Sequence, residues 1–409
     1  MAQDASHTTR VSVRGVDDAP NADDLNARPE ARRVFVLAII AVVVIVCAML
    51  LPTDMSSYYL DLTPTVIINL ISNNVNAFIG VFIGDGDLYE ARFMVVVMCA
   101  VSGAALGLCG SAYQGAFNNP LAAPKTLGVM AGGALGSLIY VIGLSDLGPQ
   151  MPYQTGTFTY SQGLEWLSSL NPLEWLWVNY GMCLCSILGC FLVVGIVLGL
   201  TSALGRGRLT NIIVIIFGQI FAVAVTAIIS FFRYLATCDG DLDTVDALKM
   251  IENYTMMRNY HYYDLLIMVV PIVICIVIVL LMSRRLTLLS FGDDEAASMG
   301  INVNKSRYVM IIVCTIMTAL SISFCGHVAF LGFISAHIAR RIVGPDFKYL
   351  LPASLLTGAT LLSLLQYLAQ SGIPFVNMYS AGSLCSIVGS IIFLCLVVVE
   401  WRKGGAGGW

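Results

Sequence analysis

The stretch from Gly110 to Ala134, GSAYQGAFNNPLAAPKTLGVMAGGA, decides the fold. A long apolar run ends at Gln114, is broken at Asn119-Pro120 and again at Pro124, and resumes through closely spaced glycines. Proline lacks a backbone donor and drives the residue before it out of the helical region. Irregular backbone at the edge of a bilayer persists only where protein or a water-filled cavity covers it. The stretch therefore predicts two membrane-spanning helices joined by an ordered, protein-packed turn.

The composition of the whole chain supports a membrane protein. Its 409 residues are 58% hydrophobic and only 11% charged, whereas soluble domains carry about 25% charged residues. A net charge of −4 gives no reason to expect a nucleic-acid partner. All of the 12 cysteines except Cys238 lie in or at the ends of apolar runs, where cysteine usually acts as a small hydrophobic residue. Cys183 and Cys185 have no second pair beside them, so no metal site is expected.

Apolar runs of near-membrane length recur along the chain and predict an all-α polytopic protein with about ten transmembrane helices. A polar segment, residues 1–33, precedes them and is expected to be a disordered cytoplasmic tail. A transmembrane domain is expected over 34–403, with outer loops at 52–90, 144–172 and 234–263. The expected spans are 34–51, 93–114, 126–144, 177–203, 209–233, 264–282, 308–325, 329–343, 350–370 and 383–400.

Charged residues between these runs predict the orientation. If every run crosses the membrane, the basic flanks fall on one side and acidic loops with few cations on the other. The positive-inside rule then places both termini in the cytoplasm. The basic flanking residues are Arg32, Arg33, Arg206, Arg208, Arg284, Arg285, Lys305, Arg307, Arg340, Arg341, Lys348, Arg402 and Lys403.

The motifs of common enzymes are missing from the sequence. A P-loop requires Gly-Lys followed by Ser or Thr, and no lysine of this chain follows a glycine. No zincin, kinase or nucleophile-elbow motif is present either. We therefore expect no catalytic residues, no bound cofactor and no ATPase activity in this chain.

The turn with its Asn-Pro-Leu-Ala core and Leu127-Gly128 resembles the signature of the FecCD-type permeases, which serve ABC importers of ferric siderophores, haem and cobalamin. Two further stretches agree with this family in order and spacing, so that the resemblance covers about 92–400. One is the cytoplasmic coupling loop, 286–302, whose family pattern is matched at Gly292, Asp293, Ala296 and Gly300. The other runs from Gly326 to Pro352.

The coupling loop also has a physical interpretation. Asp293, Asp294 and Glu295 favour the positive end of a helix dipole, and Gly300 is a typical helix stop. We expect a short helix there that docks in a groove of an ATPase subunit. An interfacial helix on lipid is the alternative, although anionic lipid would repel the three acidic residues.

The resemblance implies a dimer of permeases, identical or different, in the cell membrane. An ATP-binding subunit would dock on the inside, and an extracytoplasmic binding protein would deliver a ligand on the outside. A ferric siderophore is the first expected substrate, followed by haem and cobalamin. Gln114, Asn119, Pro120, Gly128 and His337 are expected to form the signature turn and the translocation path.

Several positions depart from the family pattern. The Arg-x-Pro-Arg motif survives only as Arg92-Phe93-Met94-Val95, so Arg92 is the expected contact for the binding protein. The alternative is that Arg92 pairs within the chain with the acidic residues Asp85, Asp87 and Glu90. The proline before His337 is replaced by Ala336. His337 is interpreted as a packing residue, with a haem-ligand or proton-relay role as the alternative.

Two other classes of protein remain possible from the residues alone. An ion-coupled secondary transporter would need ionisable side chains near the middle of the membrane, and the expected spans carry almost none there. A membrane-embedded enzyme would need Asp, His or Cys residues that converge within the bilayer, and His337 alone does not make such a cluster.

Overall fold

A computed structural model describes residues 29–50, 87–144, 169–204, 211–240, 262–370 and 380–402, together with 244, 245, 248 and 251. Within these residues the chain is helical and contains no strand. The helices are α2 (Pro29–Leu50), α4 (Asp87–Ala116), α5 (Val129–Ile139) with the π-helical η2 (Tyr140–Leu144), α7 (Pro172–Leu204), α8 (Asn211–Asp239), α10 (Tyr262–Leu281), α11 (Ser283–Leu289), α12 (Asp293–Ser298), α13 (Val303–Cys325), α14 (Leu331–Val343), α15 (Phe347–Gln370) and α16 (Ala381–Arg402).

Each of the ten expected spans coincides with a helix, which confirms the all-α prediction. Among the described residues, seven helices are long and apolar enough to cross a membrane by length and composition. Val129–Leu144 and Ala381–Ile392 are shorter apolar stretches, and α14 has 13 residues. The fold is therefore that of a polytopic membrane protein whose helices differ in length.

Some helix ends differ from the sequence-based boundaries. α2 begins at Pro29 rather than Val34, because proline fits the first helical position and Glu30 favours the positive end of the dipole. α4 begins at Asp87, and α8 continues to Asp239, so both helices extend into segments that were expected to be outer loops. The other residues of the expected tail and outer loops lie almost entirely outside the described residues.

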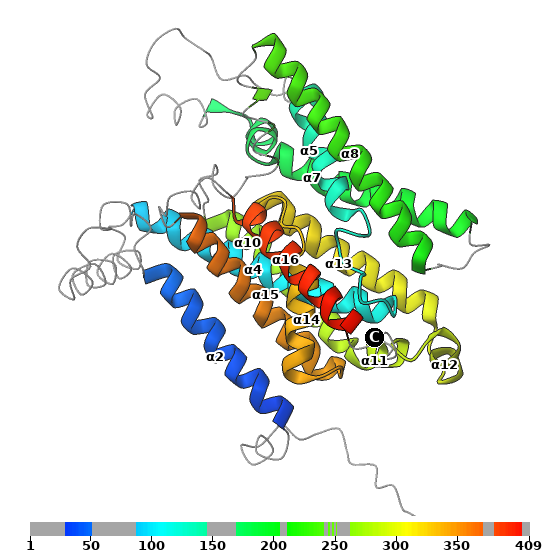
Figure 1. Ribbon diagram of the computed structural model, residues 1–409. Coiled ribbons are helices and arrows are strands. Elements are labelled where there is room, and N and C mark those ends of the chain that lie inside the picture. The colour runs from blue at the N-terminus through cyan, green and yellow to red at the C-terminus, as the bar shows by residue number, and fades with distance from the viewer. Residues whose placement is uncertain are drawn as a thin grey trace, which may run out of the picture.

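α4 and α13 form the centre of the molecule. In each, 78% of the most apolar window is buried, compared with 11% in α2. α4 packs against α13, α14 and α15, and α5 packs against α7 and α8 on the other side of α13 (Figure 1). α2 lies at the edge of the molecule and contacts α14 and α15.

Glycines allow the central helices to approach closely. A Cβ atom on Gly103 or Gly107 would collide with backbone of α15, and one on Gly132 or Gly136 with backbone of α7. Ser111 and Ser354 add a hydroxyl pair with 2.7 Å between their Oγ atoms. These glycines therefore serve helix packing, as small residues do in membranes.

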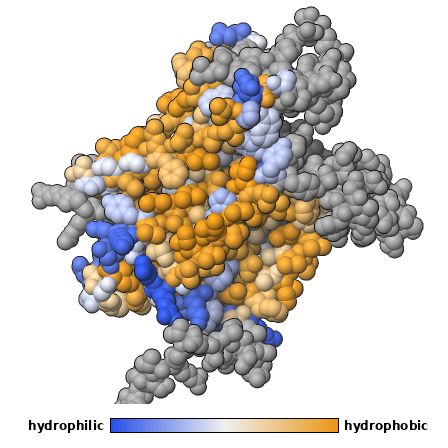
Figure 2. Space-filling view, turned by 180° about the vertical axis from the view of Figure 1, so that it is seen from behind, coloured by the Kyte–Doolittle hydropathy of each residue, from blue (hydrophilic) through white to orange (hydrophobic). Residues whose placement is uncertain are grey.

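The outer surface is suited to lipid. Apolar residues cover the middle of the face seen in Figure 2, and hydrophilic residues gather toward the end of the molecule that carries α11 and α12. Large apolar side chains on α2, α8 and α10 are exposed, among them Phe35, Val223 and Leu266. The interior is also apolar, but an exposed apolar surface of this extent is unusual in a soluble protein and matches a bilayer as the surrounding medium.

Candidate functional site

The connection between α4 and α5, residues 117–128, is ordered and packed into the protein. Phe117 and Ala122 are completely buried, and Leu127 nearly so. Asn119 accepts a hydrogen bond from the backbone N–H of Leu121 through Oδ1 at 2.9 Å, an Asx-type turn that suits the residue before a proline. The predicted break at Asn119-Pro120 and the predicted protein-packed turn are both confirmed.

The second half of this turn is closed by Thr126 and Gly128. The Thr126 hydroxyl donates to the Ala123 carbonyl at 2.8 Å and accepts from the Ala123 N–H at 2.9 Å. Gly128 has φ +77°, a left-handed conformation that glycine adopts without cost. A Cβ there would lie 3.2 Å from Gly218 of α8, so this position requires glycine for both its backbone conformation and its packing.

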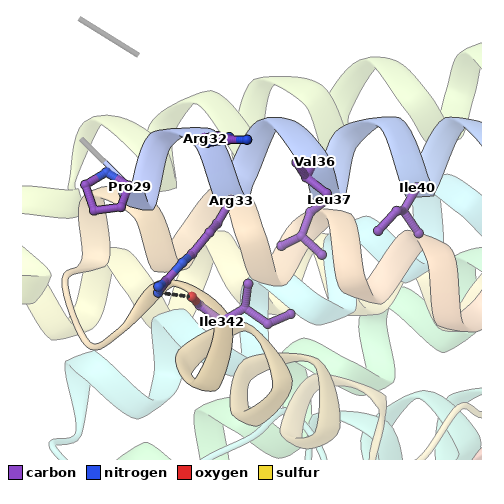
Figure 3. A pocket seen from close by; sticks show the side chains of 7 residues that line it. All are labelled: Pro29, Arg32, Arg33, Val36, Leu37, Ile40 and Ile342. Atoms are coloured by element: carbon purple, nitrogen blue, oxygen red, sulfur yellow. Dashed lines mark hydrogen bonds between the residues drawn. The ribbon is translucent and has the colours of Figure 1, made fainter. Parts of the chain in front are cut away.

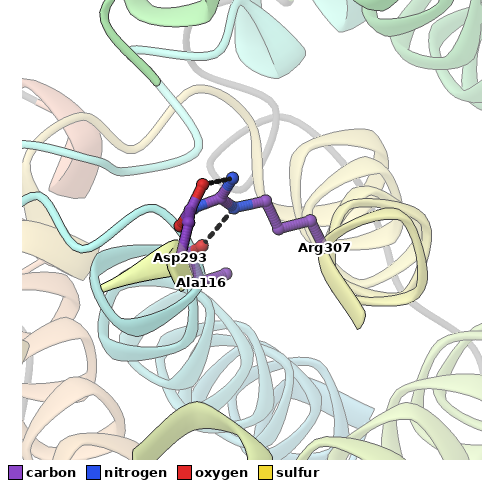
Figure 4. A network of polar contacts seen from close by, with 3 residues as sticks. All are labelled: Ala116, Asp293 and Arg307. Carbon is purple, nitrogen blue, oxygen red and sulfur yellow. Dashed lines mark hydrogen bonds and ion pairs between the residues drawn. The ribbon is translucent and has the colours of Figure 1, made fainter. Parts of the chain in front are cut away.

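A buried arginine joins the end of α4 to the coupling loop (Figure 4). Arg307 of α13 is 1% exposed, and its Nε donates to the carbonyl oxygen of Ala116 at 2.7 Å. Its two terminal nitrogens donate to Asp293 at 2.9 and 2.6 Å. The guanidinium also lies 5.9 Å from the ring centre of Phe117. One side chain thus connects α12, α13 and the first residue of the signature turn.

The coupling loop itself folds as two short helices. α12 spans Asp293–Ser298, with Gly292 before it at φ +121° and Gly300 after it at φ +83°. Ala296, within α12, is completely buried. The predicted short helix, its acidic start and its glycine stop are therefore confirmed.

The solvent-exposed side of this loop carries both apolar and acidic side chains. Phe291 and Met299 are 63% and 47% exposed, and Asp294 and Glu295 are exposed on the helix between them. Exposed large apolar residues rimmed by charge are typical of a protein-binding surface.

α14 meets the end of α4 through Gln114. Nη2 of Arg340 donates to Oε1 of Gln114 at 3.0 Å. His337, one turn earlier on α14, is half-buried and lies edge-on against Phe333, with 4.3 Å between the ring centres. Its Nε2 atom is buried and has no hydrogen-bond partner among the described residues.

A cavity of about 310 Å³ lies between the signature turn, α5, α8 and the start of α14. Lys125 reaches into this region, with its Nζ 4.2 Å from the ring centre of Phe330. Burial lowers the pKa of Lys125 from its usual value, and the aromatic face offers partial compensation to the cation. Phe330 adopts φ +64°, an unusual conformation for a bulky residue.

The structure brings Gln114, Asn119, Pro120 and Gly128 together around one turn and connects Asp293 to the same place. Arg92 lies in the first turns of α4, far along that helix from Gln114, and its side chain is outside the described residues. Asp294, Glu295 and Gly300 lie on the solvent-exposed side of the coupling loop. Among the described residues no group of His, Cys, Asp and Glu could hold a metal ion.

Sequence reasoning missed the roles of Arg307 and Lys125. Arg307 was counted among the basic flanks of the spans, where exposure is expected. The available signal was its position directly before the apolar run 308–325 and 14 residues after Asp293.

Comparison with known proteins decides the family. The model of the FecCD transport family matches residues 42–399. The chain belongs to the FecCD transport family. As a FecCD protein it is a multi-pass membrane protein with the fold of an ABC permease.

Individual relatives of this FecCD chain are distant. The Fe(3+)-citrate import system permease protein YfmE of Bacillus subtilis is 26% identical over 326 residues, 77% of this chain and 83% of that protein. The hemin transport system permease protein HmuU of Yersinia pestis is 27% identical over 320 residues, 76% of this chain and 84% of that protein.

A solved structure, a metal-chelate type ABC transporter in an inward-facing conformation, has the same fold. It superposes with a TM-score of 0.64 at 22% identity, over 90% of this chain and 99% of the other.

Proposed function

We propose that this FecCD protein is the permease subunit of an ATP-driven importer of chelated iron. A ferric siderophore is the first choice of substrate, then haem, then cobalamin. Two relatives with nearly equal sequence identity, 26 and 27%, are named for different compounds, ferric citrate and hemin. Sequence identity therefore does not select the iron compound that this chain transports. The observation that carries the proposal is the coupling loop, which presents an exposed surface and is joined by Arg307 to the signature turn.

ATP would be hydrolysed by a separate subunit that docks on this loop. Phe291 and Met299 would enter an apolar groove of that subunit, and Asp294 and Glu295 would meet basic residues at its rim. Any displacement of α12 would pass through Asp293 and Arg307 to the end of α4. This contact supplies a physical link of the kind that coupling between distant sites requires.

Charge placement supports ATP-driven rather than ion-coupled transport. Among the described residues the buried charged side chains are Asp264 and Arg307. Both lie within the first two turns of their helices, and Asp264 accepts a hydrogen bond of 2.6 Å from the Tyr180 hydroxyl. Coupling-ion sites are expected near the middle of the membrane.

A second permease subunit would cover the exposed apolar face of α8. Ile220, Val223 and Phe231 are 57%, 69% and 56% exposed there. Because α8 also borders the cavity beside Lys125, a partner on this face would close the translocation path between two subunits.

The test of the proposed function is reconstitution. The chain would be co-expressed with its ATPase and binding protein, placed in liposomes and supplied with ⁵⁵Fe-labelled siderophore, ⁵⁵Fe-labelled hemin or radiocobalt-labelled cobalamin. ATP-dependent accumulation of an iron chelate is expected, and the chain alone should hydrolyse no ATP. Uptake that follows an ion gradient without ATP would contradict the proposal.

Gly300→Val is expected to uncouple ATP hydrolysis from import. The φ of +83° at this position costs a β-branched residue about 1–2 kcal/mol or more, so the end of α12 would shift. ATPase activity and uptake would be measured in the same liposomes. A double charge reversal, Asp293→Lys with Glu295→Lys, should give the same result, and normal import in both variants would exclude the loop as the coupling element.

His337→Gln is expected to retain substantial transport. Because Nε2 has no hydrogen-bond partner among the described residues, the change should cost mainly the contact with Phe333, about 0.5–1.5 kcal/mol. Uptake by the variant, normalised to the amount of assembled complex, is the measurement. Complete loss of uptake in a well-assembled complex would favour a ligand or proton-relay role.

Arg92 is proposed as a contact for the binding protein. Because a single exposed ion pair contributes at most ~1 kcal/mol, Arg92→Glu should weaken binding modestly and act mainly on the association rate. Surface plasmon resonance at two salt concentrations would measure this. Unchanged kinetics would place the docking surface elsewhere, for example on 144–172.

A further inference from the structure

A groove of about 490 Å³ lies between the first half of α2 and the end of α14 (Figure 3). Its volume is within the range of about 300–1,000 Å³ that is usual for small-molecule sites. Its lining residues are Pro29, Arg32, Arg33, Val36, Leu37, Ile40 and Ile342. The groove is distant in sequence from the signature turn and the coupling loop, and the proposed function does not use it.

The groove has a cationic end and an apolar end. Arg32 and Arg33 lie in the first two turns of α2, and Leu37 and Ile40 follow one and two turns later along the same helix. Arg33 donates from Nη1 to the carbonyl oxygen of Ile342 at 2.8 Å. This bond fixes the guanidinium across the groove and leaves its other N–H groups available, because arginine has five donors.

The apolar end is open to the membrane. Val36 and Ile40 are each 46% exposed, and Phe35 and Ile39 on the neighbouring surface of α2 are also exposed. The two arginines therefore lie where α2 leaves the hydrocarbon, at the level of the lipid headgroups. A molecule that fits must be anionic at one end and apolar over the length of about two helical turns.

We propose that this groove binds an anionic phospholipid, with the phosphate between Arg32 and Arg33 and an acyl chain along Leu37 and Ile40. Basic pockets between transmembrane helices are suited to anionic headgroups, and guanidinium forms paired hydrogen bonds to phosphate oxygens. The lipid would bridge α2, the least buried of the long helices, to α14. It would thereby hold the edge of the permease together.

The chain itself offers a competing occupant. Asp17, Asp18, Asp23 and Asp24 precede α2 in the sequence and could supply the negative charge instead of a lipid. The acidic segment has no long apolar run to fill the second half of the groove, which favours the phospholipid.

The test is native mass spectrometry of the full chain, titrated in detergent with phosphatidylglycerol or with phosphatidylcholine of the same acyl chains. Phosphatidylglycerol should bind more tightly. Arg32→Gln should weaken it about five-fold, and Arg32→Gln with Arg33→Gln about 25-fold, at ~1 kcal/mol for each basic residue near anionic lipid. Ile40→Trp, which fills the apolar end and keeps both charges, should also weaken binding. Circular dichroism would confirm folding, and Arg32→Gln alone leaves the bond from Arg33 to α14 intact.

The matched control is Arg284→Gln with Arg285→Gln, a pair of exposed arginines on α11 whose loss changes the net charge equally. This control should leave phosphatidylglycerol affinity unchanged. An equal loss in the control, or no loss in the Arg32/Arg33 variant, would overturn the proposal in favour of diffuse attraction. Tighter lipid binding after the four aspartates are changed to Asn would also overturn it, because the groove would then belong to the acidic segment.

Discussion

Gly110→Ala is expected to prevent the permease from folding stably, although it adds only one methyl group. Gly110 lies in α4, where a Cβ atom would collide with the Cα, carbonyl carbon and oxygen of Gly332 in α14. Because all three atoms are backbone, no side chain can rotate away, and the two helices must separate. Overpacking costs about 1–3 kcal/mol where side chains can adjust, and the upper end of that range or more is expected here. Yield and melting temperature in detergent would be measured by fluorescence-detected size exclusion.

The matched control for this substitution is Gly195→Ala in α7. A Cβ there would meet no atom within 4 Å, and alanine is favoured over glycine in a helix by up to about 1 kcal/mol. The control should therefore be as stable as the native protein or slightly more stable. A melting temperature for Gly110→Ala that equals that of the control would contradict the packing of α4 on α14.

Local sequence signals were sufficient to predict the order of the helices, the signature turn after α4 and the short helix α12. Proline at position 120 and the apolar run before it indicate where α4 must end, because both act within a few residues of the chain. The acidic residues 293–295 and the glycine at 300 likewise mark both ends of α12. These predictions depend on neighbours in sequence, and the structure confirms them.

Contacts between distant parts of the chain could not be predicted in the same way. Arg307 and Ala116 are 191 positions apart, and nothing in the periodicity of either helix indicates that they meet. The rule that places basic residues at the cytoplasmic ends of spans treats Arg307 like its exposed neighbour Lys305. Lys125 was likewise unassigned, because its contact with Phe330 depends on the packing of α14 against the turn.

Asp293→Asn is expected to destabilise the cytoplasmic end of the permease and to uncouple it from the ATPase. The Asp293 side chain is 52% exposed, but the Arg307 side chain that it pairs with is 1% exposed. Asparagine keeps one oxygen that can accept from Arg307, but it removes the negative charge and one of the two acceptor oxygens. The buried cation would then have no counter-ion and only neutral acceptors, the amide oxygen and the Ala116 carbonyl. Because Asp293 is partly open to water, we expect Asp293→Asn to lower the free energy of unfolding by about 2–3 kcal/mol. This is less than the loss expected when a completely buried ion pair is broken.

The matched control is Asp294→Asn, an identical change at the next residue of α12, which is exposed and lies outside the ion pair. It should change the melting temperature little. If Asp293→Asn and Asp294→Asn have equal effects on the melting temperature, the ion pair is not the link between α12 and the turn.

Removal of one partner of the ion pair should cost more stability than removal of the other. This inequality distinguishes loss of the ion pair from a simple loss of packing. Arg307→Met removes the buried charge and leaves Asp293 half exposed, where water can solvate the carboxylate. The single Arg307→Met variant should therefore be more stable than Asp293→Asn. The double variant should be close in stability to Arg307→Met, because a neutral pair at a buried site carries little penalty. Melting temperatures of the four proteins form a double-mutant cycle, and additive losses would show that the two side chains act independently.

ATPase stimulation and uptake, measured on the same four proteins, would then show whether stability alone is recovered in the double variant. We expect coupling to remain impaired there, because the neutral pair no longer holds α12 to the carbonyl end of α4.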